Sequence, residues 1–167
     1  MLHEAEYNML LLSAKLIPAG DNLSLNTESN IANVLLVAGQ IFLLSSLRML
    51  PVTSPTCAIL LQRLVDALDS EDLLKVWIAQ CPIEALLWAI TMGMLVASSG
   101  DASMGRLSGY MDETTQLLQV TNYEDLEYIL KRYAWSDYCS INIERVWNKT
   151  SVARLGHVHS CAHGELF

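Results

Sequence analysis

The chain has 167 residues, of which 52% are hydrophobic and 17% charged, and its formal net charge is −8. This composition is typical of a folded globular chain, and the length allows a sizeable core without a metal or disulfide. Because the acidic excess repels a phosphate backbone and Lys and Arg form no cluster, we expect no direct binding of nucleic acid.

Residues that start and stop helices divide the chain into about eight predicted helices, while the alternation typical of strands is absent. Pro51 ends one helix because it disfavours α geometry in the residue before it. Ser54-Pro55 is an N-cap followed by proline, and Ser70-Glu71-Asp72 is a cap followed by two acids. The predicted helices cover residues 5–17, 31–50, 55–68, the segment from 70 to Pro82, 83–97, 104–118, 123–138 and 141–149, with a polar loop at 21–30.

The two most apolar predicted helices, 31–50 and 83–97, raise the question of a membrane. Neither contains an apolar run of the ~20 residues that a membrane span requires, so we expect no membrane insertion. Buried helices at the centre of a domain are the better interpretation. The sequence therefore predicts one all-α domain over residues 1–149, followed by a tail at 150–167 without a clear pattern.

The four cysteines are spread along the chain without C-x-x-C spacing. This usage predicts reduced thiols and a cytoplasmic or nuclear location. The tail also carries His157, His159, Cys161 and His163 at every second position, which an extended segment would place on one side. Four alternating ligands within one segment cannot surround a metal ion unaided, so we expect no metal site and no cofactor.

Short motifs between Ser46 and Lys149 occur in the order and spacing of a known family. They are Leu47-Arg48-Met49-Leu50-Pro51 with Ser54-Pro55, Leu64–Asp69 with Asp72-Leu73 and Trp77, Leu86-Leu87-Trp88 with Gly93 and Ala97, and Leu130–Cys139 with Trp147. Together they resemble the C-terminal part of the fungal-specific transcription-factor domain, an all-helical regulatory region that follows a zinc-cluster DNA-binding domain. The resemblance implies an effector-binding or interaction role. The six zinc-binding cysteines of such regulators are absent, and Tyr133-Ala134 stands where the family has Phe-Leu.

Known nucleotide-binding, hydrolytic and metalloprotease motifs are absent, which leaves cofactor-free acid–base chemistry or binding. Tyr133 and Asp137 would lie one turn apart on the predicted helix 123–138, with a phenol and a carboxylate side by side near Trp135. In a dry pocket such a pair transfers protons, and Arg48 would set the charge state of Asp137. Alternatively, Arg48 and Asp137 form an ion pair that holds two helices together.

A second group of residues is predicted to bind an apolar substrate. Asn33 and Gln40 share one face of the most apolar helix, where they either bond neighbouring backbone or face a ligand cavity. Glu84 is expected to stabilise the N-terminus of its helix. The remaining candidates either line the cavity or pack in the core: Trp88, Met92, Met94, Met104, Tyr110 and Trp135.

Three hypotheses for function follow. The first is a stand-alone enzyme of fungal specialised metabolism, which would bind an apolar small molecule and catalyse a cofactor-free cyclisation, isomerisation or addition with Asp137, Tyr133 and Arg48. The second is a regulatory module that binds an effector, acts through a protein partner and does not contact DNA. The third is a structural subunit that buries its apolar surface in a homodimer.

Overall fold

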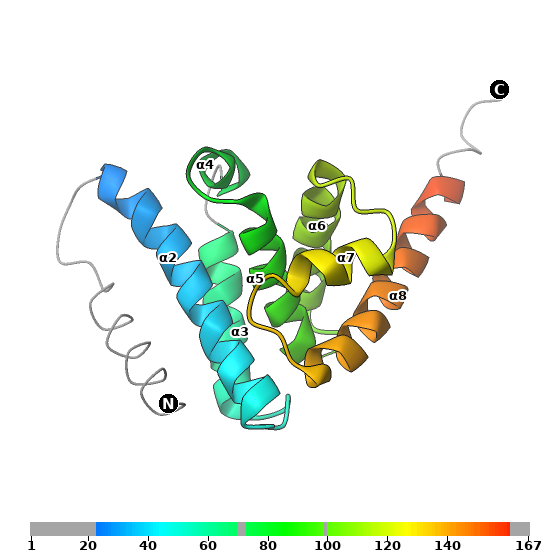
Figure 1. Ribbon diagram of the computed structural model, residues 1–167, viewed down its shortest axis with the longest axis horizontal. Helices are drawn as coiled ribbons and strands as arrows, with labels where there is room; N and C mark the ends of the chain where they lie inside the picture. The colour runs from blue at the N-terminus through cyan, green and yellow to red at the C-terminus, as the bar shows by residue number, and fades with distance from the viewer. Residues whose placement is uncertain (1–22, 70–72, 99, 161–167) are drawn as a thin grey trace.

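The computed structural model describes residues 23–69, 73–98 and 100–160, and every regular element within them is helical (Figure 1). This confirms the predicted all-α class. The predicted helix 5–17 and the cap at 70–72 lie outside the described residues. The elements are α2 (Leu23–Phe42), the π-helix η1 (Leu43–Leu47), α3 (Pro55–Leu68), α4 (Leu73–Gln80), α5 (Ile83–Val96), α6 (Ala102–Leu117), α7 (Tyr123–Leu130) and α8 (Asp137–Ser160).

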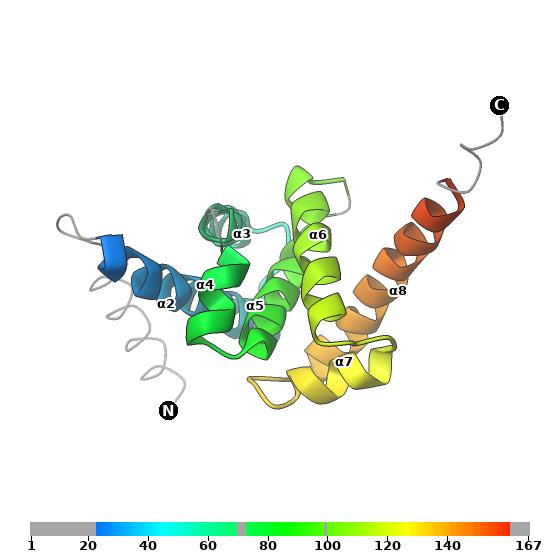
Figure 2. The same cartoon turned by 90° about the horizontal axis from the view of Figure 1, so that it is seen from above.

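Helix α5 forms the centre of the fold. Every residue from Ala85 to Val96 is buried, and α2, α3 and α6 pack around the helix together with α7 and α8 (Figures 1 and 2). A helix that is covered on all sides needs no polar face, which explains its almost continuous apolar sequence. The prediction of a central buried helix at 83–97 is thus confirmed.

Helix α2 begins at Leu23, so the predicted loop at 21–30 is wrong from that residue onward. Each polar residue there costs only a few tenths of a kcal/mol in helix propensity, roughly 0.7 kcal/mol at most, and a continuing helix tolerates such a cost. The predicted end at residue 50 also differs, because α2 continues as η1 only to Leu47. The Leu50 amide donates to the Leu44 carbonyl at 3.0 Å, and the chain turns at Met49, whose φ is 55°.

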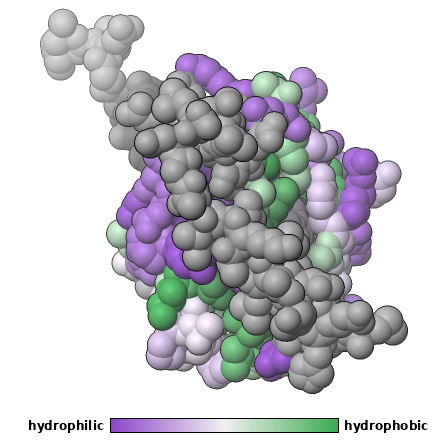
Figure 3. Space-filling model, turned by 90° about the vertical axis from the view of Figure 1, so that its left-hand side faces the viewer, coloured by the Kyte–Doolittle hydropathy of each residue, from purple (hydrophilic) through white to green (hydrophobic). Residues whose placement is uncertain are grey.

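Local caps start α3 and α6. The Ser54 hydroxyl accepts a hydrogen bond from the Cys57 amide at 3.2 Å, as the Ser-Pro pair predicts. Asp101 caps α6 by accepting from the Ser103 amide at 2.9 Å, so α6 begins at Ala102 rather than at residue 104. Between η1 and α3, Met49 is 67% exposed. On the face shown in Figure 3, hydrophobic residues lie among more hydrophilic ones toward the lower edge.

The predicted helix 123–138 is wrong, because α7 ends at Leu130 and α8 begins at Asp137. The Trp88 indole N–H donates to the Ala134 carbonyl at 2.9 Å, an acceptor that a continuous helix would have used within itself. Ser136 then starts α8 by accepting from the Cys139 amide at 3.4 Å. α8 extends past the predicted residue 149 to Ser160, and this half leads away from the rest of the fold (Figure 2).

Candidate functional site

The predicted acid–base residues do not share a helix. Tyr133 lies in the connection between α7 and α8, whereas Asp137 is the first residue of α8. The expected spacing of one helical turn is therefore wrong, since it required an unbroken helix. Asp137 is exposed, and so is Arg48, which follows the last turn of η1.

Tyr133 instead belongs to a row of aromatic side chains. Its ring stacks on the Trp88 indole with centroids 6.2 Å apart and an interplanar angle of 25°. On the other side of the row, the ring centroids of Trp88 and Phe42 lie 6.5 Å apart, with the two rings tilted by 53°. Phe42 and Trp88 are buried and Tyr133 is half-buried, so this row leads from the core to the surface. The stack and the hydrogen bond from Trp88 to Ala134 hold the α7–α8 connection against α5.

The carboxylate that acts on Tyr133 is Glu84. Burial raises the pKa of Tyr133, and the negative charge of Glu84 raises it further because that charge disfavours the phenolate. The Glu84 carboxylate also lies 3.9 Å from the Arg132 guanidinium. Glu84 and Trp88 are four residues apart on α5 and so face the same side. The neutral phenol of Tyr133 therefore stacks on the Trp88 ring and lies within the electrostatic influence of the Glu84 carboxylate.

Among the predicted site residues, the structure brings Tyr133 and Trp88 together. Asn33 and Gln40 are half-buried on α2, and the Gln40 amide oxygen is buried without a hydrogen-bond partner. Met92 is fully buried inside α5 and packs in the core. The Trp135 indole donates to the Ser140 hydroxyl at 2.9 Å, which ties it to α8.

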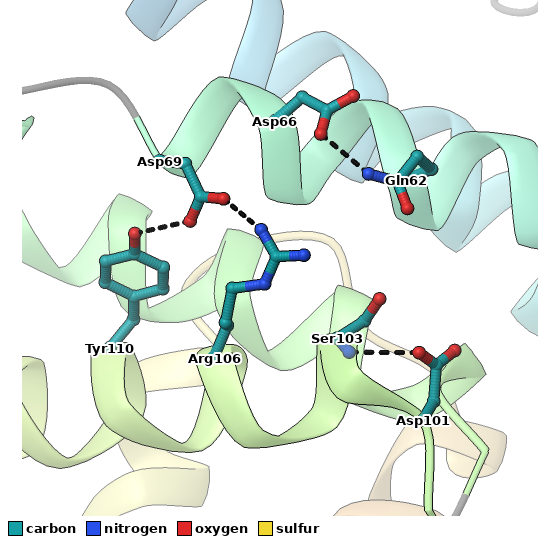
Figure 4. A network of polar contacts seen from close by, with 7 residues as sticks. All are labelled: Gln62, Asp66, Asp69, Asp101, Ser103, Arg106 and Tyr110. Atoms are coloured by element: carbon teal, nitrogen blue, oxygen red, sulfur yellow. Dashed lines mark hydrogen bonds and ion pairs between the residues drawn. The ribbon is translucent and has the colours of Figure 1, made fainter.

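Tyr110 lies in a separate polar cluster that joins α6 to the end of α3 (Figure 4). Its hydroxyl donates to the Asp69 carboxylate at 2.8 Å, and Arg106 forms an ion pair with the same carboxylate. Burial, followed by the hydrogen bond to Asp69, raises the pKa of Tyr110 to about 12. The phenol therefore stays protonated near neutral pH and serves as a hydrogen-bond donor between two helices.

A hollow that sequence reasoning missed lies between α4 and the C-terminal half of α6. It has a volume of about 340 Å³ and is lined by Leu74, Glu113, Gln116 and Leu117. Two apolar side chains of these helices reach solvent, since Leu117 is 53% exposed and Ile78 is 59% exposed. The only sequence signal for the hollow was these apolar residues on the outer positions of their helices.

Neither a metal site nor a membrane span is found in the described part of the chain. His, Cys, Asp and Glu side chains form no group of three there that would hold a metal ion. None of the described helices combines the length and hydrophobicity needed to cross a bilayer. His157 and His159 lie on helix α8 and so do not form the extended segment that would place them on one side, and Cys161 and His163 lie outside the described residues.

Comparisons with known proteins add no relative. No family model, no curated protein and no solved structure matches the chain. The resemblance to the fungal transcription-factor domain therefore stays a prediction from short motifs. Function is inferred below from the described side chains alone.

Proposed function

We propose that this chain is a protein-interaction module that acts through a partner and does not itself contact DNA. The observation that carries the proposal is the hollow between α4 and α6, whose apolar walls are Leu74 and Leu117 and where Leu117 leaves more than half of its area in water. Exposed apolar side chains beside a concave surface are typical of interaction sites. The described cysteines Cys57, Cys81 and Cys139 are free thiols, which agrees with action in the cytoplasm or nucleus.

Affinity purification followed by reconstitution tests this role. The immobilised full chain is incubated with extract of its source organism, and each retained protein is then produced pure and titrated against the chain. We expect at least one partner to bind in a complex of fixed stoichiometry with a Kd of about 10 µM or tighter. If no retained protein binds in the purified system, the interaction role is wrong.

A second candidate function, cofactor-free acid–base catalysis on an apolar small molecule, is favoured by the surroundings of Tyr133. The phenol is a proton donor and Glu84 is a candidate base. In this proposal Glu84 takes the role that the sequence assigned to Asp137.

Substitutions at Glu84 and Asp137 distinguish which of these two carboxylates takes part in the proposed catalysis. For a substrate identified by product formation, Tyr133→Phe and Glu84→Gln are each expected to lower kcat at least ~100-fold, the size of a typical general acid–base contribution. Asp137→Asn, the matched control, is expected to leave kcat unchanged. Full turnover in both the Tyr133→Phe and Glu84→Gln variants would reject the site.

A further inference from the structure

We propose that the hollow between α4 and α6 binds a basic amphipathic helix of the partner protein. This inference rests on the interaction role proposed above and adds the site and the chemistry of the partner. The hollow of about 340 Å³ has two apolar walls, Leu74 from α4 and Leu117 from α6, and two polar groups, Glu113 and Gln116.

The apolar part of the surface comes from both helices. Ile78 follows Leu74 by one turn of α4, so the two side chains lie on neighbouring positions of one face. Ile78 is 59% exposed and Leu117 is 53% exposed, while Leu74 is half-buried between them and the core. A partner that covers these side chains removes apolar area from water, which is the main favourable term in protein association.

The charge of the hollow selects a basic partner. Glu113 is exposed, and no ion pair to it is found among the described residues, whereas Asp69 nearby is already paired with Arg106. A Lys or Arg side chain fits this setting, because its methylene stem packs on Leu117 while its cationic head reaches the Glu113 carboxylate.

The shape of α6 favours a helix as the occupant. Gly105, Gly109 and Glu113 follow one another at intervals of four residues and so lie along one face. Apart from the nearby chain of α6 itself, no heavy atom lies within 4 Å of the position that a Cβ would take at Gly105 or Gly109, so this face is open. A second helix that packs along this face of α6 meets no side chain at Gly105 or Gly109. Its other end would reach Glu113 and therefore the hollow.

A second copy of this chain is a poorer occupant than a basic partner. In a twofold-symmetric dimer across this face of α6, the interface would hold the Glu113 carboxylates of both copies, and like charges at an interface oppose association. The formal charge of −8 on each chain adds to this repulsion.

A synthetic helix tests the proposal directly. The probe is a labelled amphipathic peptide of about 18 residues built from Leu and Lys, long enough to form a helix when bound. Its control has Glu at every Lys position and the same apolar face. Binding of both peptides to the full chain is measured by fluorescence anisotropy at about 0.05 M and about 0.5 M salt, which changes the screening of exposed charges.

The Lys peptide is expected to bind at least tenfold more tightly than the Glu peptide at low salt. Glu113→Gln is expected to weaken its binding about threefold at low salt and hardly at all at high salt, as for an exposed ion pair. Leu117→Ala is expected to weaken it about tenfold at either salt concentration. The matched controls Glu144→Gln and Ile141→Ala, both at exposed positions of α8, are expected to leave binding unchanged.

Equal affinity for the Lys and Glu peptides would overturn the proposal. So would α8 control variants that lose as much affinity for the Lys peptide as Glu113→Gln and Leu117→Ala do. So would a homodimer of the wild-type chain that dissociates on Leu117→Ala, because it would assign the hollow to a second copy. If a reconstituted partner keeps its Kd with Glu113→Gln and Leu117→Ala, the basic-helix site fails while the interaction role stands. If the Lys peptide binds as expected but no protein partner is reconstituted, the interaction role fails and the affinity of the hollow stands.

Discussion

Three helical glycines allow the packing around α5 to be measured against helix propensity. A Cβ added at Gly93 would lie 2.8 Å from Leu64 Cδ2 and 3.2 Å from Leu107 Cδ1, and both leucines are fully buried. Gly105 and Gly109 on α6 have open space at the same position. The same Gly→Ala change is therefore opposed by packing at one site and unopposed at the other two.

The expected free energies follow from two opposing terms. In a helix interior, Ala is more favourable than Gly by about 1 kcal/mol. Forcing a methyl group into the contact of α5 with α3 and α6 costs about 1–3 kcal/mol, because Leu64 and Leu107 are held on all sides. We expect Gly93→Ala to lower the free energy of unfolding by about 1 kcal/mol and Gly105→Ala or Gly109→Ala to raise it by about 0.5–1 kcal/mol.

Urea unfolding followed by far-ultraviolet circular dichroism measures these differences. Equal slopes of the unfolding free energy against urea concentration would show that the three variants and the wild-type chain unfold from comparable states. The difference of about 2 kcal/mol between Gly93→Ala and the α6 variants lies well above the precision of the midpoints. A Gly93→Ala protein as stable as Gly109→Ala would refute the reasoning, because Leu64 and Leu107 would then move aside at no cost.

Two further predictions concern Tyr110 and Gln119. Burial and then the bond to Asp69 raise the pKa of Tyr110 from 10.0 to about 12, so the neutral phenol contributes stability below pH 10 that is lost as pH rises toward 12. The free energy of unfolding measured across this range is expected to fall less steeply in Tyr110→Phe than in wild type, and parallel profiles would contradict the assignment. Gln119 has φ 55°, in the left-handed region, so Gln119→Gly is expected to raise the free energy of unfolding by about 1 kcal/mol. The same change at Gln116, within α6, is expected to lower it by about 1 kcal/mol, and a stabilised Gln116→Gly or a destabilised Gln119→Gly would contradict this account.

The parts of the fold that were predictable from the sequence depend on local signals. The Ser54 side chain caps the helix that follows it, and this requires only the next three residues. The segment 83–97 is apolar at nearly every position, so any helix formed there had to be buried. Both predictions were confirmed because no distant contact was needed to decide them.

The errors arise where distant contacts or overlooked caps decide the structure. Ser136-Asp137 carries the signature of a helix start, a hydroxyl followed by an acid in the first turn, although the predicted helix 123–138 runs through it. The bond from Trp88 to Ala134 then fixes the non-helical connection, and no local pattern around Ala134 indicates it. At the other end of the fold, the polar residues at 23–30 resemble a loop in composition, yet α2 runs through them.

The predicted spacing of Tyr133 and Asp137 is wrong for the same reason as the helix that was to carry both residues. Residues four apart face one side only while the helix between them is continuous, and the break after Leu130 separates Tyr133 from Asp137. On α5, where the helix is continuous, the same rule places Glu84 beside Trp88. The stack of Tyr133 on Trp88 then brings the phenol under the influence of Glu84, a residue distant in sequence. The stacking of Tyr133 on Trp88 therefore decides which carboxylate influences this phenol. For this reason the informative experiment is to substitute Glu84 rather than Asp137.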